Sequence, residues 1–85
     1  MRSSTTRRFR DAFGRLPPDI QRLARDKYRL WLRDAGHPSL HFKRAGDYWS
    51  VRIGDGYRAL GREHDGTMRW LWIGSHDEYE RMLMR

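Results

Sequence analysis

The sequence predicts an α+β fold in which two N-terminal helices pack on a four-stranded antiparallel β-meander, followed by a short C-terminal helix. Three observations lead to this class. Apolar residues recur at helical spacing up to Gly36, alternate with polar residues from Ser39 to Ile73, and return to helical spacing after Ser75. With 85 residues, the chain has the length of one domain, residues 1–85, with a small core.

Two helices are expected before residue 37. Thr5 and Thr6 are both good N-cap types, Phe9, Ala12 and Phe13 follow at helical spacing, and Gly14 ends the run. The second helix starts at Pro17 and Pro18, because proline suits a first helical turn, and it ends near Gly36, which we expect in the left-handed conformation. Its predicted apolar face consists of Ile20, Leu23, Ala24, Tyr28, Trp31 and Ala35.

Alternation of apolar and polar residues predicts four strands, at residues 39–43, 48–53, 57–63 and 68–73. Gly54-Asp55-Gly56 and Asp65-Gly66 have the composition of hairpin turns and connect the last three strands. The stretch from Arg2 to Thr6 is a candidate for an extra short N-terminal strand.

The register of the second and third strands follows from the apolar pattern. A three-residue turn with Gly56 left-handed pairs Ile53 with Tyr57, whereas a two-residue turn would put charges on the apolar face. The chosen register sets Arg52 directly beside Arg58. It also places Gly61 between two tryptophans, which we expect to meet across it, and these are Trp49 and Trp70.

Two interpretations of the arginine pair are open. Like charges directly opposite one another destabilise a sheet unless an anion or solvent intervenes, which favours an anion-binding site at Arg52 and Arg58 that Lys43 and Arg44 join. Alternatively, the aliphatic stems of the two arginines cover apolar residues of the same sheet face, namely Leu60, Leu71 and Ile73.

The last helix has a capping-box sequence. Ser75 is its expected N-cap and Glu78 stands three positions later. His76 and Tyr79 then lie on nearly the same helix face, as a candidate acid–base pair or, alternatively, as an exposed histidine beside a core tyrosine.

The charge of the chain favours a polyanionic partner. The formal net charge is +7, with 16 Arg and 2 Lys, and arginine is suited to bidentate contacts with phosphate. The absence of cysteine excludes thiolate metal sites and Cys nucleophiles, and we expect no cofactor, metal, small-molecule ligand or membrane association, and a cytoplasmic location. Arg, Lys, His and Tyr together suit metal-free RNA cleavage, in which the 2′-hydroxyl of the RNA attacks the neighbouring phosphate.

Nearly the whole chain resembles the RelE/ParE superfamily of bacterial type II toxins. The most specific part is the Gly-Tyr-Arg strand at residues 56–58, followed by a hydrophobic strand and a terminal helix that opens with His and Tyr. The resemblance rests on residues 37–43, 48–54, 56–61 and 70–79.

The resemblance implies a toxin that a cognate antitoxin neutralises, and a RelE-like member would be an endoribonuclease that cuts mRNA on the ribosome. It implies that Arg52 holds phosphate, Arg58 stabilises the transition state, Tyr79 orients the nucleotide and His76 acts as an acid. RelE-type members carry a lysine where this chain has Ser50, so His41, Lys43 or His76 remains as the base. The residues expected to bind nucleic acid are His41, Lys43, Arg44, Ser50 and Arg62.

Two alternatives stay open. The ParE branch shares the fold but inhibits DNA gyrase and is not a nuclease, so the fold alone does not decide between the branches. A degenerate member would bind its antitoxin without any activity of its own. The pair His76 and Tyr79 favours the nuclease branch.

Overall fold

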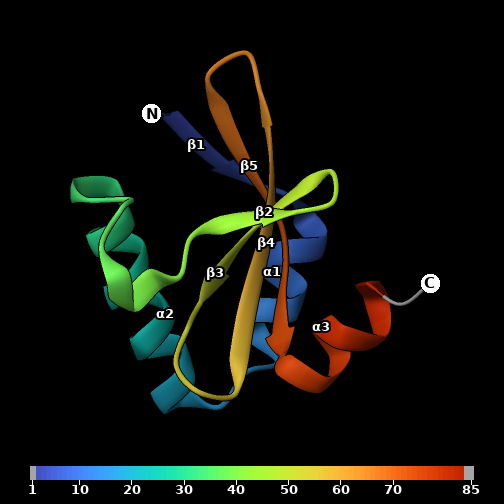
Figure 1. Cartoon of the computed structure of the whole chain (residues 1–85). Coiled ribbons are helices and arrows are strands. Elements are labelled where there is room, and N and C mark those ends of the chain that lie inside the picture. The colour runs from blue at the N-terminus through green and yellow to red at the C-terminus, as the bar shows by residue number, and fades with distance from the viewer. Residues whose placement is uncertain (1, 84–85) are drawn as a thin grey trace.

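A mixed sheet of five strands carries three helices in the computed structural model, which describes residues 2–83 (Figure 1). No helix in this part of the chain is both long and apolar enough to cross a membrane. The elements in chain order are β1 (Arg2–Thr5), α1 (Arg7–Gly14), α2 (Pro18–Arg33), the 3₁₀ turn η1 (Pro38–Leu40), β2 (Lys43–Ala45), β3 (Tyr48–Arg52), β4 (Tyr57–His64), β5 (Thr67–Ser75) and α3 (His76–Leu83).

The strand order β1-β5-β4-β3-β2 confirms the predicted α+β class and the antiparallel meander from β2 to β5. The candidate N-terminal strand is real: β1 adds to the outer edge of the meander, parallel to β5, with Thr5 opposite Trp70. In Figure 1 the β4–β5 hairpin projects beyond the rest of the sheet, next to β1 and the N-terminus.

Thr6 begins α1 and fastens it to the sheet. Its hydroxyl oxygen accepts a hydrogen bond from the backbone N–H of Phe9 at 3.1 Å, as predicted for an N-cap. The same hydroxyl donates to the carbonyl oxygen of Leu71 at 3.3 Å, and the backbone N–H of Thr6 donates to Trp70 at 3.0 Å. One residue therefore links β1, α1 and β5.

The second helix ends earlier than the glycine signal predicted. It stops at Arg33, where the Asp34 N–H donates to Leu30 at 2.7 Å and Asp34 itself is extended at φ −156°. Gly36 lies beyond the helix and does not have a positive φ, so its predicted role as a left-handed cap is wrong.

The first predicted strand is also largely wrong. Residues 38–40 form η1, whose start is capped by His37, because the His37 Nδ1 atom accepts from the Ser39 N–H at 3.1 Å. Leu40 is completely buried in this turn and His41 is left-handed at φ 44°, so the alternation of apolar residues here reflects a packed turn. Only residues 43–45 pair as β2.

Pairing of β3 with β4 confirms the predicted register, with Arg52 opposite Arg58 and the Ile53 N–H donating to Tyr57 at 3.0 Å. The left-handed glycine of this turn is Gly54, at φ +117°, and not Gly56. The next turn has the expected two residues, Asp65 and Gly66, both with positive φ as a type I′ turn requires.

A β-bulge in β5 decides which side chains enter the core. Gly61 pairs with Trp70 and Leu60 pairs with Trp72, which leaves Leu71 without a partner in β4. This extra residue shifts the register by one, so Ile73 faces the same side as Ala59, and Trp72 shares the opposite side with Leu60. The predicted position of Ile73 on the face of the arginines is therefore wrong, whereas that of Leu60 is confirmed.

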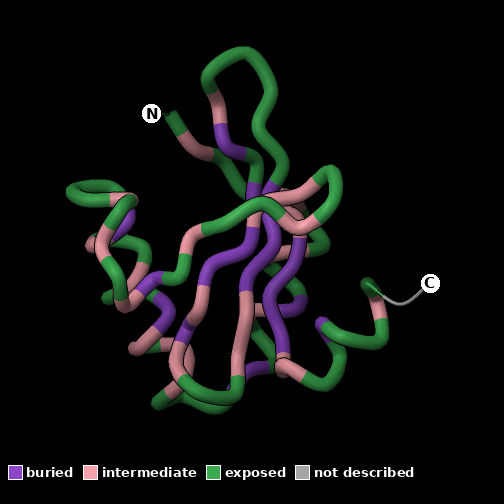
Figure 2. Tube along the Cα trace, viewed as in Figure 1, coloured by how far each residue is buried: buried purple, intermediate pink, exposed green. Residues whose placement is uncertain are grey.

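The central strands of the sheet are buried (Figure 2), and most of the core lies between α1, α2 and one face of the sheet. Leu60 and Trp72 on the opposite face and Tyr79 of α3 belong to the same buried cluster. Aromatic rings pack against one another in the part under α2. Trp31 of α2 packs edge-on against Trp70 at 5.2 Å and against Phe42 at 5.9 Å, and Phe42 stacks on Trp49 at 4.6 Å. Trp49 and Trp70 are therefore joined through Trp31 and Phe42, not directly across Gly61 as expected.

We predict that Thr6→Ala lowers the free energy of unfolding by about 1 kcal/mol or more, because it removes both the helix cap and the bond to the bulge. Thr6→Ser keeps the hydroxyl and is the matched control. Urea denaturation followed by tryptophan fluorescence measures both variants. Equal midpoints for Thr6→Ala and wild type would contradict the linking role of Thr6.

Candidate functional site

The sheet face that α1 and α2 leave uncovered carries the predicted site, and we call it the arginine face. By strand alternation and the observed register, it consists of Lys43, Ser50, Arg52, Arg58, Leu60, Arg62, Arg69, Trp72 and Gly74. Its centre is apolar and buried, with Leu60 and Trp72 less than a tenth exposed. Arginine pairs flank this centre toward both ends of the strands.

Arg52 and Arg58 converge on one backbone oxygen. The Arg52 Nε atom donates to the Gly54 carbonyl oxygen at 3.3 Å, and the Arg58 Nη1 atom donates to the same oxygen at 3.2 Å. Arg58 also donates to the Tyr57 carbonyl oxygen at 2.9 Å, and Arg52 forms an ion pair with the exposed Asp55. These contacts hold two guanidinium groups together in spite of their repulsion.

Gly54 makes this arrangement possible, a role that was not predicted from the sequence. Its φ of +117° is a conformation that side chains rarely adopt, and a Cβ atom there would lie 2.8 Å from the Leu23 Cδ2 atom. The turn therefore needs glycine at residue 54, packed against α2, to aim its carbonyl oxygen at both arginines. The sequence does contain a sign of this role, because the Gly54-Asp55-Gly56 turn has two glycines and either could adopt a positive φ.

His41 lies next to the arginine pair. The left-handed backbone of this residue at the end of η1 places its exposed side chain so that Nε2 is 3.5 Å from the Arg52 Nη1 atom. A positive φ in a residue other than glycine is uncommon. The turn formed by residues 38–40 thus brings an imidazole to Arg52, the residue for which the family resemblance implies phosphate binding.

The start of α3 lies at the same end of the sheet. Gly74 is opposite Arg58, and the His76 N–H donates to the Gly56 carbonyl oxygen at 2.8 Å. The predicted capping box is present, with Glu78 Oε1 accepting from the Ser75 N–H at 3.2 Å and the Ser75 hydroxyl accepting from the Glu78 N–H at 3.2 Å. It fixes the helix start and hence the position of His76.

His76 and Tyr79 are neighbours, but only the histidine is accessible. Their ring centroids are 6.0 Å apart, as the three-residue spacing predicted. Tyr79 is only 8% exposed and belongs to the hydrophobic core, so its ring is not presented for stacking on a nucleotide as expected. His76 is instead paired with Glu80, whose Oε1 atom lies 3.5 Å from Nε2, a partner that the four-residue spacing could have revealed.

The remaining predicted nucleic-acid contacts separate into three groups. Lys43 and Arg62 are exposed on the arginine face. Ser50 lies on this face but is only 1% exposed, so it does not offer its hydroxyl to a ligand. Arg44 points to the other face, where its guanidinium lies over the Trp49 ring at 5.6 Å, so it does not join the arginine pair.

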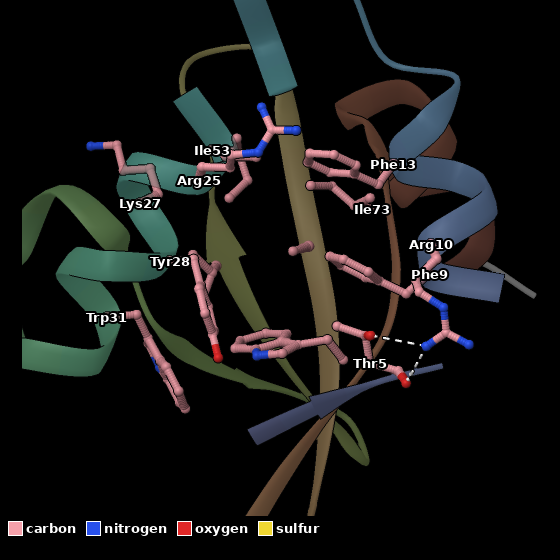
Figure 3. Close-up of a pocket in the computed structure, with 14 residues that line it drawn as sticks. Thr5, Phe9, Arg10, Phe13, Arg25, Lys27, Tyr28, Trp31, Ile53 and Ile73 are labelled. Carbon is pink, nitrogen blue, oxygen red and sulfur yellow. Dashed lines mark hydrogen bonds between the residues drawn. The ribbon is translucent and has the colours of Figure 1, made fainter. Parts of the chain in front are cut away.

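An apolar groove lies on the helix-covered face, between α1 and α2 (Figure 3). Its volume is about 460 Å³, and Phe9, Phe13 and Tyr28 form its walls above a floor that includes Trp70. Cationic groups stand among these residues: Arg10 donates to the Thr5 carbonyl oxygen at 2.9 Å, and Arg25 lies over the Phe13 ring at 5.1 Å. The indole N–H groups of two groove residues are buried and have no acceptor within residues 2–83, and these are Trp31 and Trp70.

Residues 18–81 match the family model described as a ParE-like toxin domain. The chain belongs to the ParE-like toxin domain family. The match covers about three quarters of the chain, from α2 to α3, and includes both arginines of the pair and His76. Comparison with curated proteins finds no match.

Solved structures support the same fold. The YoeB/ParE toxin from Agrobacterium tumefaciens is 19% identical, with 89% of this chain and 99% of that chain covered and a TM-score of 0.69. The RelBE2 toxin–antitoxin complex from Mycobacterium tuberculosis gives 22% identity, 88% and 96% coverage and a TM-score of 0.66. YafQ from Escherichia coli gives 10% identity, 93% and 98% coverage and a TM-score of 0.70.

Replacement of Gly54 tests the geometry of the arginine pair. We predict that Gly54→Ala lowers the free energy of unfolding by about 1–3 kcal/mol, because the alanine is strained at this φ and meets Leu23. Gly56→Ala is the matched control in the same turn, because a Cβ atom there meets nothing within 4 Å, and its cost should stay within about 0.5 kcal/mol. Thermal unfolding measures both, and equal costs would refute the special role of Gly54.

Proposed function

We propose that this ParE-like domain is the toxin of a toxin–antitoxin module and acts in the cytoplasm as a metal-independent endoribonuclease on ribosome-bound mRNA. The observation that carries the proposal is the convergence of Arg52 and Arg58 on the Gly54 carbonyl oxygen, with His41 beside Arg52 and His76 at the same end of the sheet. Two guanidinium groups, with one imidazole beside Arg52 and a second on the helix that starts at the same end of the sheet, suit the cleavage of a phosphodiester by its own 2′-hydroxyl. The resemblance to RelE-like toxins in the sequence points to mRNA on the ribosome.

In this mechanism Arg52 and Arg58 bind the scissile phosphate and stabilise the negative charge that develops on its oxygens. His41 is the general base: it removes the proton of the 2′-hydroxyl, whose oxygen then attacks the phosphorus. His76 is the general acid: it gives a proton to the leaving 5′-oxygen as the bond from phosphorus to that oxygen breaks. The products are a 2′,3′-cyclic phosphate and a free 5′-hydroxyl. Glu80 orients the His76 ring.

We predict that Arg58→Ala reduces mRNA cleavage about 100-fold or more, because it removes a donor to the transition state. Arg22→Ala removes the same charge from the exposed side of α2 and should cleave like the wild type. Primer extension on a defined mRNA in a cell-free translation reaction compares the three proteins. Full cleavage by Arg58→Ala would refute the catalytic assignment.

Inhibition of DNA gyrase is the second candidate function. It is favoured by the ParE-like description of the matching family and by the burial of Tyr79, which leaves the site without an accessible aromatic residue at that position. This candidate predicts intact mRNA together with loss of supercoiling in a gyrase assay. Absence of growth arrest on expression would instead indicate a degenerate member that only binds its antitoxin.

The antitoxin, in our proposal, docks an acidic amphipathic segment in the groove between α1 and α2. Apolar walls suit the buried side of such a segment, and Arg10 and Arg25 provide complementary charge at the groove (Figure 3). Several solved structures with this fold are complexes of a toxin with an antitoxin, including RelB–RelE from Methanococcus jannaschii.

We predict that Arg25→Glu weakens binding of the cognate antitoxin by about tenfold or more, because the new carboxylate repels an acidic segment. Arg22→Glu, one helical turn earlier and exposed, makes the same charge change and should bind normally. Isothermal titration calorimetry measures both. Equal affinities of the two variants would exclude the groove as the docking site.

A further inference from the structure

A second arginine pair lies on the arginine face, at the end opposite to Arg52 and Arg58. Arg62 of β4 is directly opposite Arg69 of β5, and both residues are exposed. They belong to the β4–β5 hairpin, which projects from the body of the protein and is exposed at its tip (Figure 2). The two-residue turn at residues 65–66 fixes this pairing.

Both pairs face the same side of the sheet. Arg58 and Arg62 are four residues apart on one strand and therefore lie on one face, separated by about 13 Å. Arg2 of β1 pairs with Thr67 at the same end of the sheet. Because the next residue, Met68, is buried in the core, alternation places Thr67 and Arg2 on the arginine face. The arginine face thus carries cationic groups at both of its ends, at the proposed cleavage site and on the projecting hairpin.

The second arginine pair, unlike Arg52, has no carboxylate partner among the described residues. Within residues 2–83, neither Arg62 nor Arg69 forms an ion pair. The strands contain a single carboxylate, that of Glu63, and alternation places it on the face away from Arg62. They contain seven cationic residues, namely Arg2, Lys43, Arg44, Arg52, Arg58, Arg62 and Arg69.

Like charges directly opposite one another on a sheet destabilise it, and both of these arginines are exposed to solvent. An external anion removes the repulsion. Arginine forks match phosphate in a bidentate manner, and contacts to phosphate fix the position of a nucleic acid strand without reading its sequence. The distance to Arg58 requires an anion with several charges along an extended chain.

We propose that Arg62 and Arg69, supported by Arg2, form a second phosphate-binding site that holds single-stranded RNA next to the scissile nucleotide. The inference rests on the proposed ribonuclease function, because it takes the same RNA strand to run along the arginine face from the hairpin to Arg52 and Arg58. The second site contributes affinity and fixes the direction of the strand, and it takes no part in the chemical step.

The test is binding of a fluorescein-labelled, 2′-O-methylated RNA hexanucleotide, which the protein cannot cleave, measured by fluorescence anisotropy between 50 and 200 mM salt. The double variant Arg62→Gln/Arg69→Gln removes two charges from the hairpin. The matched control Arg22→Gln/Arg33→Gln removes two charges from the exposed side of α2. Circular dichroism verifies that both variants fold.

We expect the hairpin variant to bind the hexanucleotide at least tenfold more weakly at 50 mM salt, with the slope of log K against log salt reduced by about 1.4, since each lost phosphate contact accounts for about 0.7. The α2 control should keep the wild-type slope. In cleavage of an unmodified RNA, the hairpin variant should raise KM with little change in kcat.

Equal slopes for the hairpin variant and the α2 control would overturn the proposal, as would absence of RNA binding by the wild type. Loss of antitoxin affinity without loss of RNA affinity would also overturn it and assign this surface to the antitoxin. If the hairpin variant loses slope but the wild type does not cut mRNA, the second phosphate site is supported and the ribonuclease function fails.

Discussion

One unpaired residue in β5, Leu71, decides how the two faces of the sheet are used. Because it opposes no residue of β4, the strand changes register between Trp70 and Trp72. As a result, Ile73 is buried in the core on the helix-covered face, and Trp72 lies at the centre of the arginine face. The Leu71 carbonyl oxygen accepts a hydrogen bond from the hydroxyl of Thr6, the N-cap residue of α1. The bulge therefore also fixes where α1 begins. Core, helix placement and the arginine face all depend on it.

The two faces differ in the kind of partner that they suit. The helix-covered face buries an aromatic network and retains an apolar groove between α1 and α2. The arginine face keeps like charges side by side, which costs stability that the Gly54 carbonyl oxygen and Asp55 partly offset. A small domain with marginal stability that keeps such repulsion is suited to an anionic ligand. Separate faces for an apolar segment and for a polyanion allow the two partners to be recognised by different side chains.

Several sequence signals that act over a few residues were confirmed, although the positive φ expected at Gly56 occurs at Gly54. The capping box at Ser75, the N-cap at Thr6, the Asp65-Gly66 turn and the pairing of Arg52 with Arg58 are all present as predicted. Signals that compete with packing were not confirmed. Leu40 alternates with polar neighbours like a strand residue, yet it is buried in a 3₁₀ turn. Gly36 does not cap α2, because the helix ends at Arg33.

The sequence by itself determined the helices, the hairpin turns and the arginine pair, because caps, turns and two-residue periodicity are properties of neighbouring residues. The pairing of Arg62 with Arg69 also follows from the sequence, because the predicted two-residue turn at Asp65-Gly66 sets these residues opposite one another. Only the tertiary structure decided the parallel pairing of β1, the bulge at Leu71, the burial of Tyr79 and the face of Arg44. These depend on contacts between segments far apart in the chain, where side chains compete for one small core, and no local pattern records that competition.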